Sequence, residues 1–423
     1  MSVKYRRPKW GAVLSGVGAL ALVAVVAACS SSTSSTGSST STGSSSSSTG
    51  ALGSNPIKIG EICDCSGALA SAGVDDPNVY QAWANTVNAS GGINGHKVQI
   101  VSENTNSNPG NALTDVENLV NNDHVIAIVD ISNLDETFAS FLKSKNVPVV
   151  GLNTSEEPFY ANSDFYPMGQ TEDALFAGII DSAKGAGATT IGELYCAEAV
   201  QCQEAVAPFK SAAAASGLPL KYTAEISATA PSYTAQCVAA QQAHISALFI
   251  ADIATVVSKV AQDCSQQGYH PIYVLDGETI NQSYATLTGL KDNLVGPSPD
   301  IPFYATTPAV TAMNAALDKY YPGLRANATN FNEFAVGAWV SGQLFTTAAK
   351  AGGLGANGST PTSAQLVTGL NSLKTETLDG LAPNLTFTSG QPHPDDCWYT
   401  FALKNGQWSL PNGTKTTCET AAS

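Results

Sequence analysis

The feature that most constrains the fold is a repeated alternation between short apolar runs and longer segments with helical spacing. The apolar runs cover residues 57–62, 98–101, 125–129, 147–150, 190–194, 247–250 and 272–275. Most of them are separated by segments whose apolar residues recur at helical spacing, such as 79–87, 112–120, 138–142 and 256–261. Strand and helix repeated in this order predict an α/β fold in which parallel sheets carry helices on both faces.

The length of the chain predicts two lobes. About 370 residues follow the low-complexity N-terminal segment, which is too long for one hydrophobic core. In open parallel sheets, ligands bind beyond the carboxyl ends of the strands. Functional residues are therefore expected in the loops that directly follow the predicted strands.

Several segments, in a fixed order, resemble one protein family. They read IKIGEICDCSGALASAG, GGINGHKVQIVSENTNSNPGNA, VIAIVDISN, NVPVVGLNTS, GYHPIYVLDGE and FALKNGQW, between Ile57 and Trp408. Together they are similar to the type I solute-binding proteins of the Leu/Ile/Val-binding kind, which are extracytoplasmic receptors of ABC importers. The resemblance implies two doubly wound parallel-sheet lobes joined by three crossovers, which close on a solute. It places lobe one at 57–166 plus 298–375, and lobe two at 167–297 plus 376–423.

The same resemblance implies three site loops in lobe one. Ser66 and Gly67 follow the first strand, where backbone approaches the ligand in similar proteins. Ser132 and Asn133 follow the third strand, where the family binds a ligand carboxylate. The small and hydroxylated residues that complete this clamp are Asn153, Thr154 and Ser155. Free backbone NH groups near helix starts also favour an anion.

The resemblance implies a fourth site loop in lobe two. Glu278, and after it Asp276, are expected to accept the ligand's ammonium group. Amino-acid binders of the family often present an aromatic residue after the strand at 247–250, but Asp252 stands in this loop. Asp252 is therefore expected to contact an amide, a polyol or a cation, and Tyr195 with the loop 196–202 is expected to form the missing wall.

The N-terminus predicts export and a lipid anchor. The first ten residues carry four Lys or Arg and no acid, and Gly11–Ala28 is apolar or small. This is the pattern of a secretory signal peptide, residues 1–28. The ending Val-Ala-Ala-Cys resembles a bacterial lipobox, in which Cys29 takes the lipid and anchors the protein to the outer face of the cell membrane. The alternative is an uncleaved membrane anchor, for which about 18 apolar residues are at the short limit.

Residues 29–54 are almost entirely Ser, Thr and Gly after the cysteine, which predicts a flexible linker. The formal net charge is −15, and it becomes −19 once residues 1–28, with four positive and no negative charges, are removed. A chain this acidic is not expected to bind nucleic acid, which needs clustered Lys and Arg.

The eight cysteines other than Cys29 favour disulfides in an exported protein. Spacing does not fix their connectivity. Cys196 with Cys202 and Cys397 with Cys418 are local pairs, Cys237 with Cys264 would join neighbouring helices, and Cys63 with Cys65 remains by elimination. A zinc site is the alternative, but no second cysteine pair has the spacing of a zinc ribbon or finger.

The sequence contains no residue pattern typical of an enzyme. The five histidines are scattered, with none at metal-binding spacing, and the mature chain has no Gly-x-Ser-x-Gly motif. Gly353–Gly358 matches the dinucleotide fingerprint but follows a helical segment where the fingerprint requires a strand. No catalytic residue, metal or cofactor is expected.

The sequence thus predicts a lipid-anchored monomer that captures a small polar solute, an amino acid or an amide-type compound, and delivers it to an ABC permease. A sensor that signals to a membrane receptor uses the same closure and remains an alternative. A secreted hydrolase is a third alternative, but it lacks a nucleophile.

Overall fold

The computed structural model describes residues 52–419. The predicted signal peptide, Cys29 and the linker up to residue 51 lie outside the described residues and stay predictions. Within the described range, no helix has both the length and the hydropathy that a membrane crossing requires. The first strand begins at Gly53, so the end of the predicted linker already belongs to a sheet.

The first sheet has five parallel strands in the spatial order β2-β1-β3-β4-β5. Their bounds are β1 Gly53–Cys63, β2 His96–Asn104, β3 Ile128–Asp130, β4 Val149–Gly151 and β5 Phe165–Pro167. Strands β3, β4 and β5 are buried along their whole length, as expected for parallel strands covered on both faces. Gly151, at the end of β4, has no room for a side chain, because a Cβ there would lie 2.0 Å from the carbonyl oxygen of Asp130.

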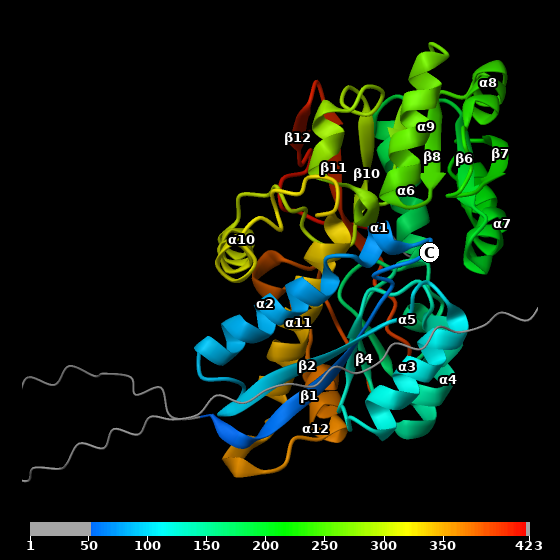
Figure 1. The fold of residues 1–423 in the computed structure, drawn as a ribbon. Coiled ribbons are helices and arrows are strands. Elements are labelled where there is room, and N and C mark those ends of the chain that lie inside the picture. Colours follow the sequence, from blue (N-terminus) through cyan, green and yellow to red (C-terminus); the bar gives the residue numbers. More distant parts are fainter. Residues whose placement is uncertain (1–51, 420–423) are drawn as a thin grey trace, which may run out of the picture. The chain divides into compact units, whose positions relative to one another are not determined.

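Helices cover both faces of this sheet (Figure 1). Those that follow its strands are α1 Ala70–Gly73, α2 Asp76–Ala89, α3 Pro109–Asn121, α4 Asp135–Lys145 and α5 Pro158–Ala161. Three more come from much later in the chain, namely α10 Pro308–Tyr320, α11 Glu333–Ala351 and α12 Ser363–Ser372. Helix α11 is buried on almost all sides and packs on α2 and α12, whereas α3 and α4 pack together on the other face. The Trp83 ring packs edge-on against Phe345 and its Nε1 donates to Thr346 Oγ1 at 3.1 Å, which joins α2 to α11.

The second sheet has the order β12-β11-β10-β9-β8-β6-β7, and β13 pairs with β11. Its strands are β6 Ile191–Cys196, β7 Leu220–Ile226, β8 Ala247–Ala251, β9 Ile272–Val274, β10 Leu294–Ser298, β11 Cys397–Lys404, β12 Gln407–Ser409 and β13 Thr417–Cys418. The strands from β7 to β10 are parallel, and β11 and β12 continue the sheet in antiparallel pairing. The second sheet is therefore parallel except at the edge formed by the C-terminal strands.

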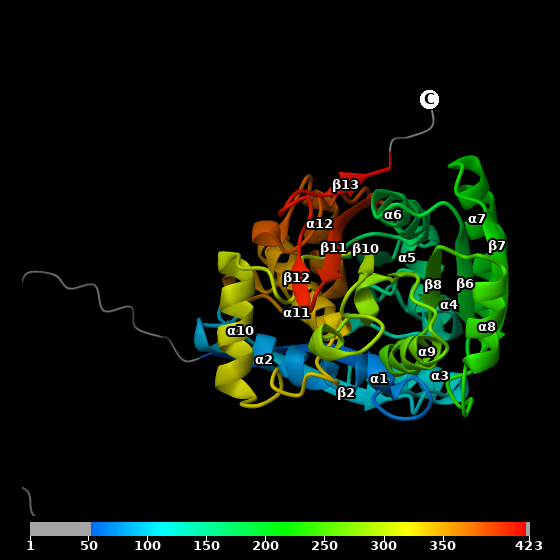
Figure 2. The same ribbon diagram turned by 90° about the horizontal axis from the view of Figure 1, so that it is seen from above.

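Its helices are α6 Glu172–Gly185, α7 Val200–Ala215, α8 Thr234–Gln242 and α9 Ala254–Gln266. Successive residues of β8 point to opposite faces. Ala247 and Phe249 pack with α6 and α7, whereas Leu248 and Ile250 belong to the core on the side of α8 and α9. Figure 2 shows α9 and α6 on opposite sides of the strands. These two sheets, each between two layers of helices, confirm the predicted α/β fold class.

The chain passes between the two sheets three times. The crossings are the segment after β5, the segment after β10, and the long segment between α12 and β11. This last segment contains η4 Leu378–Gly380, and the other short 3-10 turns are η1 Gly277–Thr279, η2 Gln282–Thr286 and η3 Ala356–Gly358.

The structure joins the eight cysteines of the described residues in four disulfides. The pairs are Cys63–Cys65, Cys196–Cys202, Cys237–Cys264 and Cys397–Cys418. Three of them lie in the second lobe, where Cys237–Cys264 connects α8 to α9 and Cys397–Cys418 connects β11 to β13.

Candidate functional site

The loops that follow the strands of the two sheets meet each other. Thr154 follows β4 of the first sheet, and Asp276 and Glu278 follow β9 of the second. The Thr154 hydroxyl oxygen lies 2.7 Å from Asp276 Oδ2 and 2.9 Å from Glu278 Oε2. The Thr154 backbone NH also donates to Glu278 Oε2, at 3.4 Å. These contacts join the two lobes directly, so the structure is a closed form.

Asp276 and Glu278 are adjacent carboxyl groups that both contact the Thr154 hydroxyl. A hydroxyl has one proton to donate, so it cannot fully satisfy both carboxylates at once. Burial raises the pKa of Glu278 well above its usual range, and the adjacent Asp276 carboxylate raises it further. Burial also raises the pKa of Asp276. Both carboxyl groups are therefore harder to ionise than a carboxyl group exposed to water.

Two further contacts connect the lobes. Gln201, in the first turn of α7, donates through Nε2 to the Asn133 carbonyl oxygen at 3.3 Å and also to Glu156 Oε1. On α1 and α9, the hydroxyl oxygens of Ser71 and Thr255 lie 3.3 Å apart. These contacts and those of Thr154 are polar links between the two lobes.

A cavity of about 100 Å³ lies between the lobes. A water molecule takes up about 10–15 Å³ on this measure, so the cavity has room for several waters or a small solute. Its polar walls come from both lobes: Asn133, Asn153 and Ser155 from lobe one, and Glu193, Gln201, Asp252, Asp276, Glu278 and Thr279 from lobe two. Its apolar walls include Leu69, Leu175, Phe176, Phe249, Ile253, Phe334 and the disulfide Cys196–Cys202.

Six of the ten predicted ligand-binding residues line this cavity. They are Asn133, Asn153, Ser155, Asp252, Asp276 and Glu278. Thr154 lies at the contact between the lobes instead. Ser132 is fully buried, and its hydroxyl accepts from the backbone NH of Leu134 at 3.1 Å. Ser66 and Gly67 lie outside the cavity lining, and the Ser66 hydroxyl donates to Asn106 Oδ1 at 2.7 Å.

The two asparagines of lobe one are held in place by a buried network. Asp64 Oδ2 accepts from the backbone NH and the side-chain amide of Asn133, at 2.9 and 3.2 Å. Asn133 Oδ1 in turn accepts from Asn153 Nδ2 at 2.9 Å, and Asn153 Oδ1 accepts from the backbone NH of Ser155. Asp64 lies between the two cysteines of the first site loop and does not line the cavity. It therefore positions Asn133, and through it Asn153, without being part of the cavity wall.

The cavity is also lined by residues that the sequence did not predict. Three aromatic rings, Phe176, Phe249 and Phe334, line it, although none follows the strand where the family pattern expects an aromatic residue. The loop 196–202 does form part of the wall, through Cys196, Ala199, Gln201 and Cys202, whereas Tyr195 does not. Glu193 is a further missed residue, and an acid within the apolar run 190–194 was the available signal.

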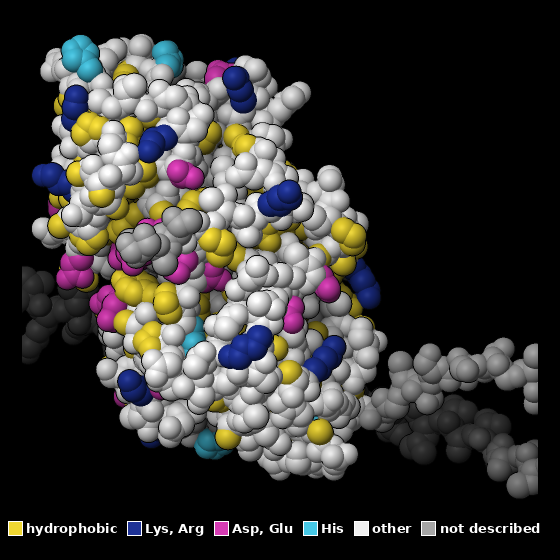
Figure 3. Space-filling view, turned by 180° about the vertical axis from the view of Figure 1, so that it is seen from behind, with side chains coloured by type: hydrophobic (Ala, Val, Ile, Leu, Met, Phe, Trp, Pro, Cys, Tyr) yellow, Lys and Arg dark blue, Asp and Glu magenta, His cyan; other side chains and the backbone are white. Residues whose placement is uncertain are grey.

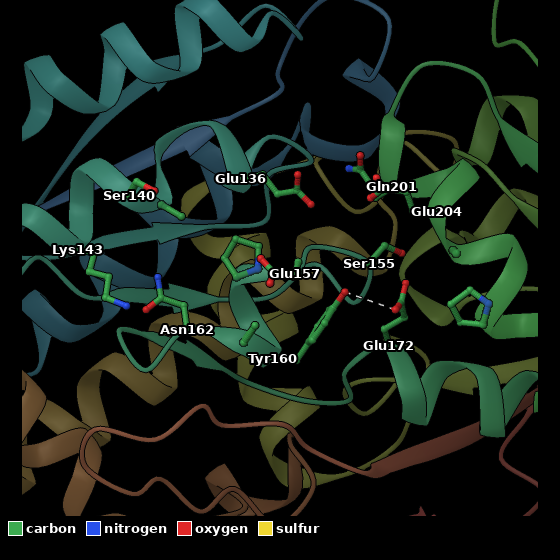
Figure 4. A pocket seen from close by; sticks show the side chains of 15 residues that line it. Glu136, Ser140, Lys143, Ser155, Glu157, Tyr160, Asn162, Glu172, Gln201 and Glu204 are labelled. Atoms are coloured by element: carbon green, nitrogen blue, oxygen red, sulfur yellow. Dashed lines mark hydrogen bonds between the residues drawn. The ribbon is translucent and has the colours of Figure 1, made fainter.

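A second, larger hollow of about 670 Å³ adjoins the cavity. Ser155, Gln201 and Ala205 line both spaces. Figure 4 shows this hollow between the two lobes; its charged lining residues are Glu136, Glu157, Glu172, Glu204 and Lys143. The Tyr160 hydroxyl donates to Glu172 Oε2 at 3.4 Å. We call this hollow, with its four glutamates and one lysine, the acidic vestibule.

One group of potential metal ligands occurs in the described part of the chain, Glu61 with Cys63 and Cys65. The two sulfur atoms are joined to each other in a disulfide, so they do not act as thiolate ligands in this state.

Comparison with known proteins identifies the family. The profile described as periplasmic binding protein matches residues 56–407. No curated protein matches the chain. Among solved structures, a branched-chain amino acid ABC transporter protein from Thermus thermophilus with bound valine has a TM-score of 0.76 at 11% identity, covering 87% of this chain and 98% of that one.

Two other similar structures have different ligands in their descriptions. A fatty acid ABC transporter substrate-binding protein from Thermomonospora curvata has a TM-score of 0.70 at 17% identity, covering 86% of this chain and 93% of that one. A solute-binding protein from R. palustris in complex with benzoate has a TM-score of 0.70 at 14% identity, covering 86% and 98%. At such identities the likeness establishes the fold, which is that of the type I periplasmic binding proteins.

The profile covers most of the chain, including the parallel strands of both sheets, apart from the first residues of β1, and all three crossings between the sheets. It describes binding proteins and not enzymes, which confirms the prediction that this protein is not an enzyme. The chain belongs to the periplasmic binding protein family.

Proposed function

We propose that this protein is an extracytoplasmic receptor that captures a small polar solute between its lobes and delivers it to an ABC importer. The observation that carries the proposal is the closed cavity, whose walls come from both lobes and whose lobes are joined by the Thr154 contacts. A solute bound there contacts both lobes only when they are closed. It therefore favours the closed form over the open one, which is the requirement for ligand-driven closure.

We further propose that the solute is an amino acid or an amide-type compound. Amide groups of Asn133, Asn153 and Gln201 line the cavity, and they both donate and accept hydrogen bonds. Glu278 is 4% exposed, and its Oε1 has no hydrogen-bond partner among the described residues. A buried acceptor without a donor favours a ligand that brings one, and an ammonium group or an amide NH₂ does so.

Delivery to a membrane permease is supported by the sequence. The predicted lipid on Cys29 and the linker that follows it would keep the receptor beside the membrane. The closed form then differs from the open form in the relative position of the lobes, which is what a permease can recognise. In this proposal the transporter's ATPase, and not this protein, provides the energy for import.

Thermal unfolding in the presence of amino acids, amides, sugars and polyols tests the ligand class. A ligand present at 100 times its Kd stabilises the folded state by about 2.7 kcal/mol, which gives a rise in Tm of several degrees. The Glu278→Gln variant is expected to lose this rise, and Glu117→Gln, which alters an exposed acid on α3, is expected to keep it. If no amino acid or amide changes Tm while another class does, the proposed ligand class is wrong.

A further inference from the structure

The second lobe presents a row of acids to the cavity. Glu193 lies on β6, Asp252 directly follows β8, and Asp276 and Glu278 follow β9. Strands β6, β8 and β9 are consecutive neighbours in the sheet, and in the register Glu193 lies opposite Phe249 of β8. All four acids line the cavity, and none of its lining residues is Lys, Arg or His. The cavity therefore has four potential negative charges and no positive charge of its own.

Glu193 is the unusual member of this row. Its side chain is 1% exposed, and Oε2 has no hydrogen-bond partner among the described residues. Its register partner Phe249 packs in the core beneath α6 and α7, together with Leu175 and Phe176, and these three apolar side chains also line the cavity. Glu193 thus presents a carboxyl group with an unused acceptor at an apolar part of the cavity.

An unpartnered buried carboxyl group is costly unless something compensates for it. Burial raises the pKa of Glu193 and that of Asp252 to about 7. A cation close to these carboxyl groups favours their ionised form. Asp252 Oδ1 accepts from the backbone NH of Ile253, but its Oδ2 is also without a partner among the described residues. Because the described residues provide no donor for these two carboxylate oxygens, we expect the solute to provide one.

The approach to the cavity has the same charge. The acidic vestibule adjoins the cavity at Ser155 and Gln201 and carries four glutamates against one lysine. On the face shown in Figure 3, acidic side chains gather in a band across the middle of the molecule, whereas Lys and Arg are scattered. A hollow lined by charges of one sign concentrates solutes of the opposite sign.

We propose that Glu193 forms a second cation-binding subsite, so that the solute has a basic group at its far end in addition to the group that Glu278 accepts. This inference rests on the proposed function and narrows its ligand class to basic amino acids and their amides. Glu193 lies on β6 and Glu278 in the turn η1 that follows β9; β6 and β9 flank β8, so the two strands are two spacings of about 4.8 Å apart. The two basic groups are therefore separated by several bonds, and the apolar side chains beside Glu193 contact the methylene groups between them.

Calorimetric titration of the full chain with matched probes tests the inference. L-lysine and L-norleucine have the same backbone and the same length of hydrocarbon, but only lysine has the terminal ammonium group. A hydrogen bond to a charged group favours binding at least tenfold, so lysine is expected to bind at least ten times more tightly than norleucine. Glu193→Gln is expected to remove this preference, so that the variant binds lysine and norleucine with similar affinity.

The matched control is Glu225→Gln. Glu225 lies on the neighbouring strand β7 and is exposed, so its substitution is expected to leave both affinities unchanged. Circular dichroism establishes that each variant is folded. An unchanged lysine preference in Glu193→Gln would overturn the subsite.

The remaining outcomes separate this inference from the proposed function. If norleucine or glutamine binds as tightly as lysine, the second subsite is refuted while an amino-acid receptor stands. If 1,5-diaminopentane binds and all amino acids and amides fail, the basic subsite holds and the proposed amino-acid class is wrong. If none of these probes binds, both are refuted.

Discussion

Substitution of Glu61 by Gln should stabilise the protein at alkaline pH and have little effect at acidic pH. Glu61 lies on β1, is fully buried, and neither of its carboxylate oxygens has a hydrogen-bond partner among the described residues. Ser102 is near enough to lower the pKa slightly, but it makes no hydrogen bond of normal geometry. Burial dominates and, with the charge of Asp64, raises the pKa of Glu61 from 4.5 to about 8.

The sign and size of the effect follow from proton linkage. Between pH 4.5 and about 8, Glu61 is protonated in the folded protein and ionised in the unfolded chain, so unfolding releases a proton. Rising pH therefore lowers the free energy of unfolding by about 1.4 kcal/mol per pH unit. Glu61 alone lowers the free energy of unfolding by about 5 kcal/mol between those two pH values. Gln has nearly the same shape as the protonated Glu and does not ionise.

Urea denaturation at pH 5 and at pH 8.5, with the disulfides intact, measures this effect. We expect Glu61→Gln and the parent protein to have similar midpoints at pH 5, and the variant to be more stable by several kcal/mol at pH 8.5. The control is the exposed Glu117→Gln, which should match the parent at both pH values. A stability difference between Glu61→Gln and the parent that is the same at both pH values would refute the reasoning.

Three further substitutions test other parts of the structure. Thr154→Val removes the donor between the lobes, and it should weaken binding of any solute found in the thermal screen by about tenfold or more; equal Kd values by calorimetry would contradict the assigned contact. Gly342→Ala should lower stability by about 1–3 kcal/mol, because its Cβ would lie 2.5 Å from Trp83 Cδ2; an unchanged Tm would show that α11 and α2 are not packed as described. Replacing both Cys237 and Cys264 by Ser opens a link that spans 27 residues, and the urea midpoint should fall by the equivalent of about 3 kcal/mol; a midpoint equal to the parent's would mean that the bond does not stabilise the fold.

The sequence predicted the fold class because the core strands are continuous apolar runs. Strands β3 and β4 are fully buried, and the apolar runs 125–129 and 147–150 each include two of the three residues of one strand. Strand β7 was not predicted, since it is an edge strand whose residues alternate between exposed and partly buried positions and form no apolar run. The antiparallel edge made by β11 and β12 was missed for a different reason. Strand direction there depends on how the chain crosses between lobes, which no local pattern records.

The sequence predicted those residues of the candidate site that directly follow a strand. Asp276 and Glu278 were expected to be functional on these grounds, and the structure places both at the cavity. Ser132 satisfies the same rule, but its hydroxyl is bonded to its own loop. Glu193 could not be predicted in this way, because it lies inside a strand. Its access to the cavity depends on how α6 and α7, which also line the cavity, pack against β6, and this is a property of tertiary packing.

The order of the elements along the chain has a consequence for biogenesis. Helix α11 packs on β3 and β4 of the first sheet, α10 packs on α2, and α12 packs on α11, although all three helices come after every parallel strand of the second sheet. Strand β11, from the last thirty residues, completes the second sheet. Neither lobe is therefore a continuous fragment that can be expressed alone, and a chain truncated before Cys397 would leave β10 as a bare edge. Because synthesis starts at the N-terminus, neither lobe can be completed until most of the chain has been made. We expect its maturation to be slow and vulnerable to proteolysis until the C-terminal strands are in place.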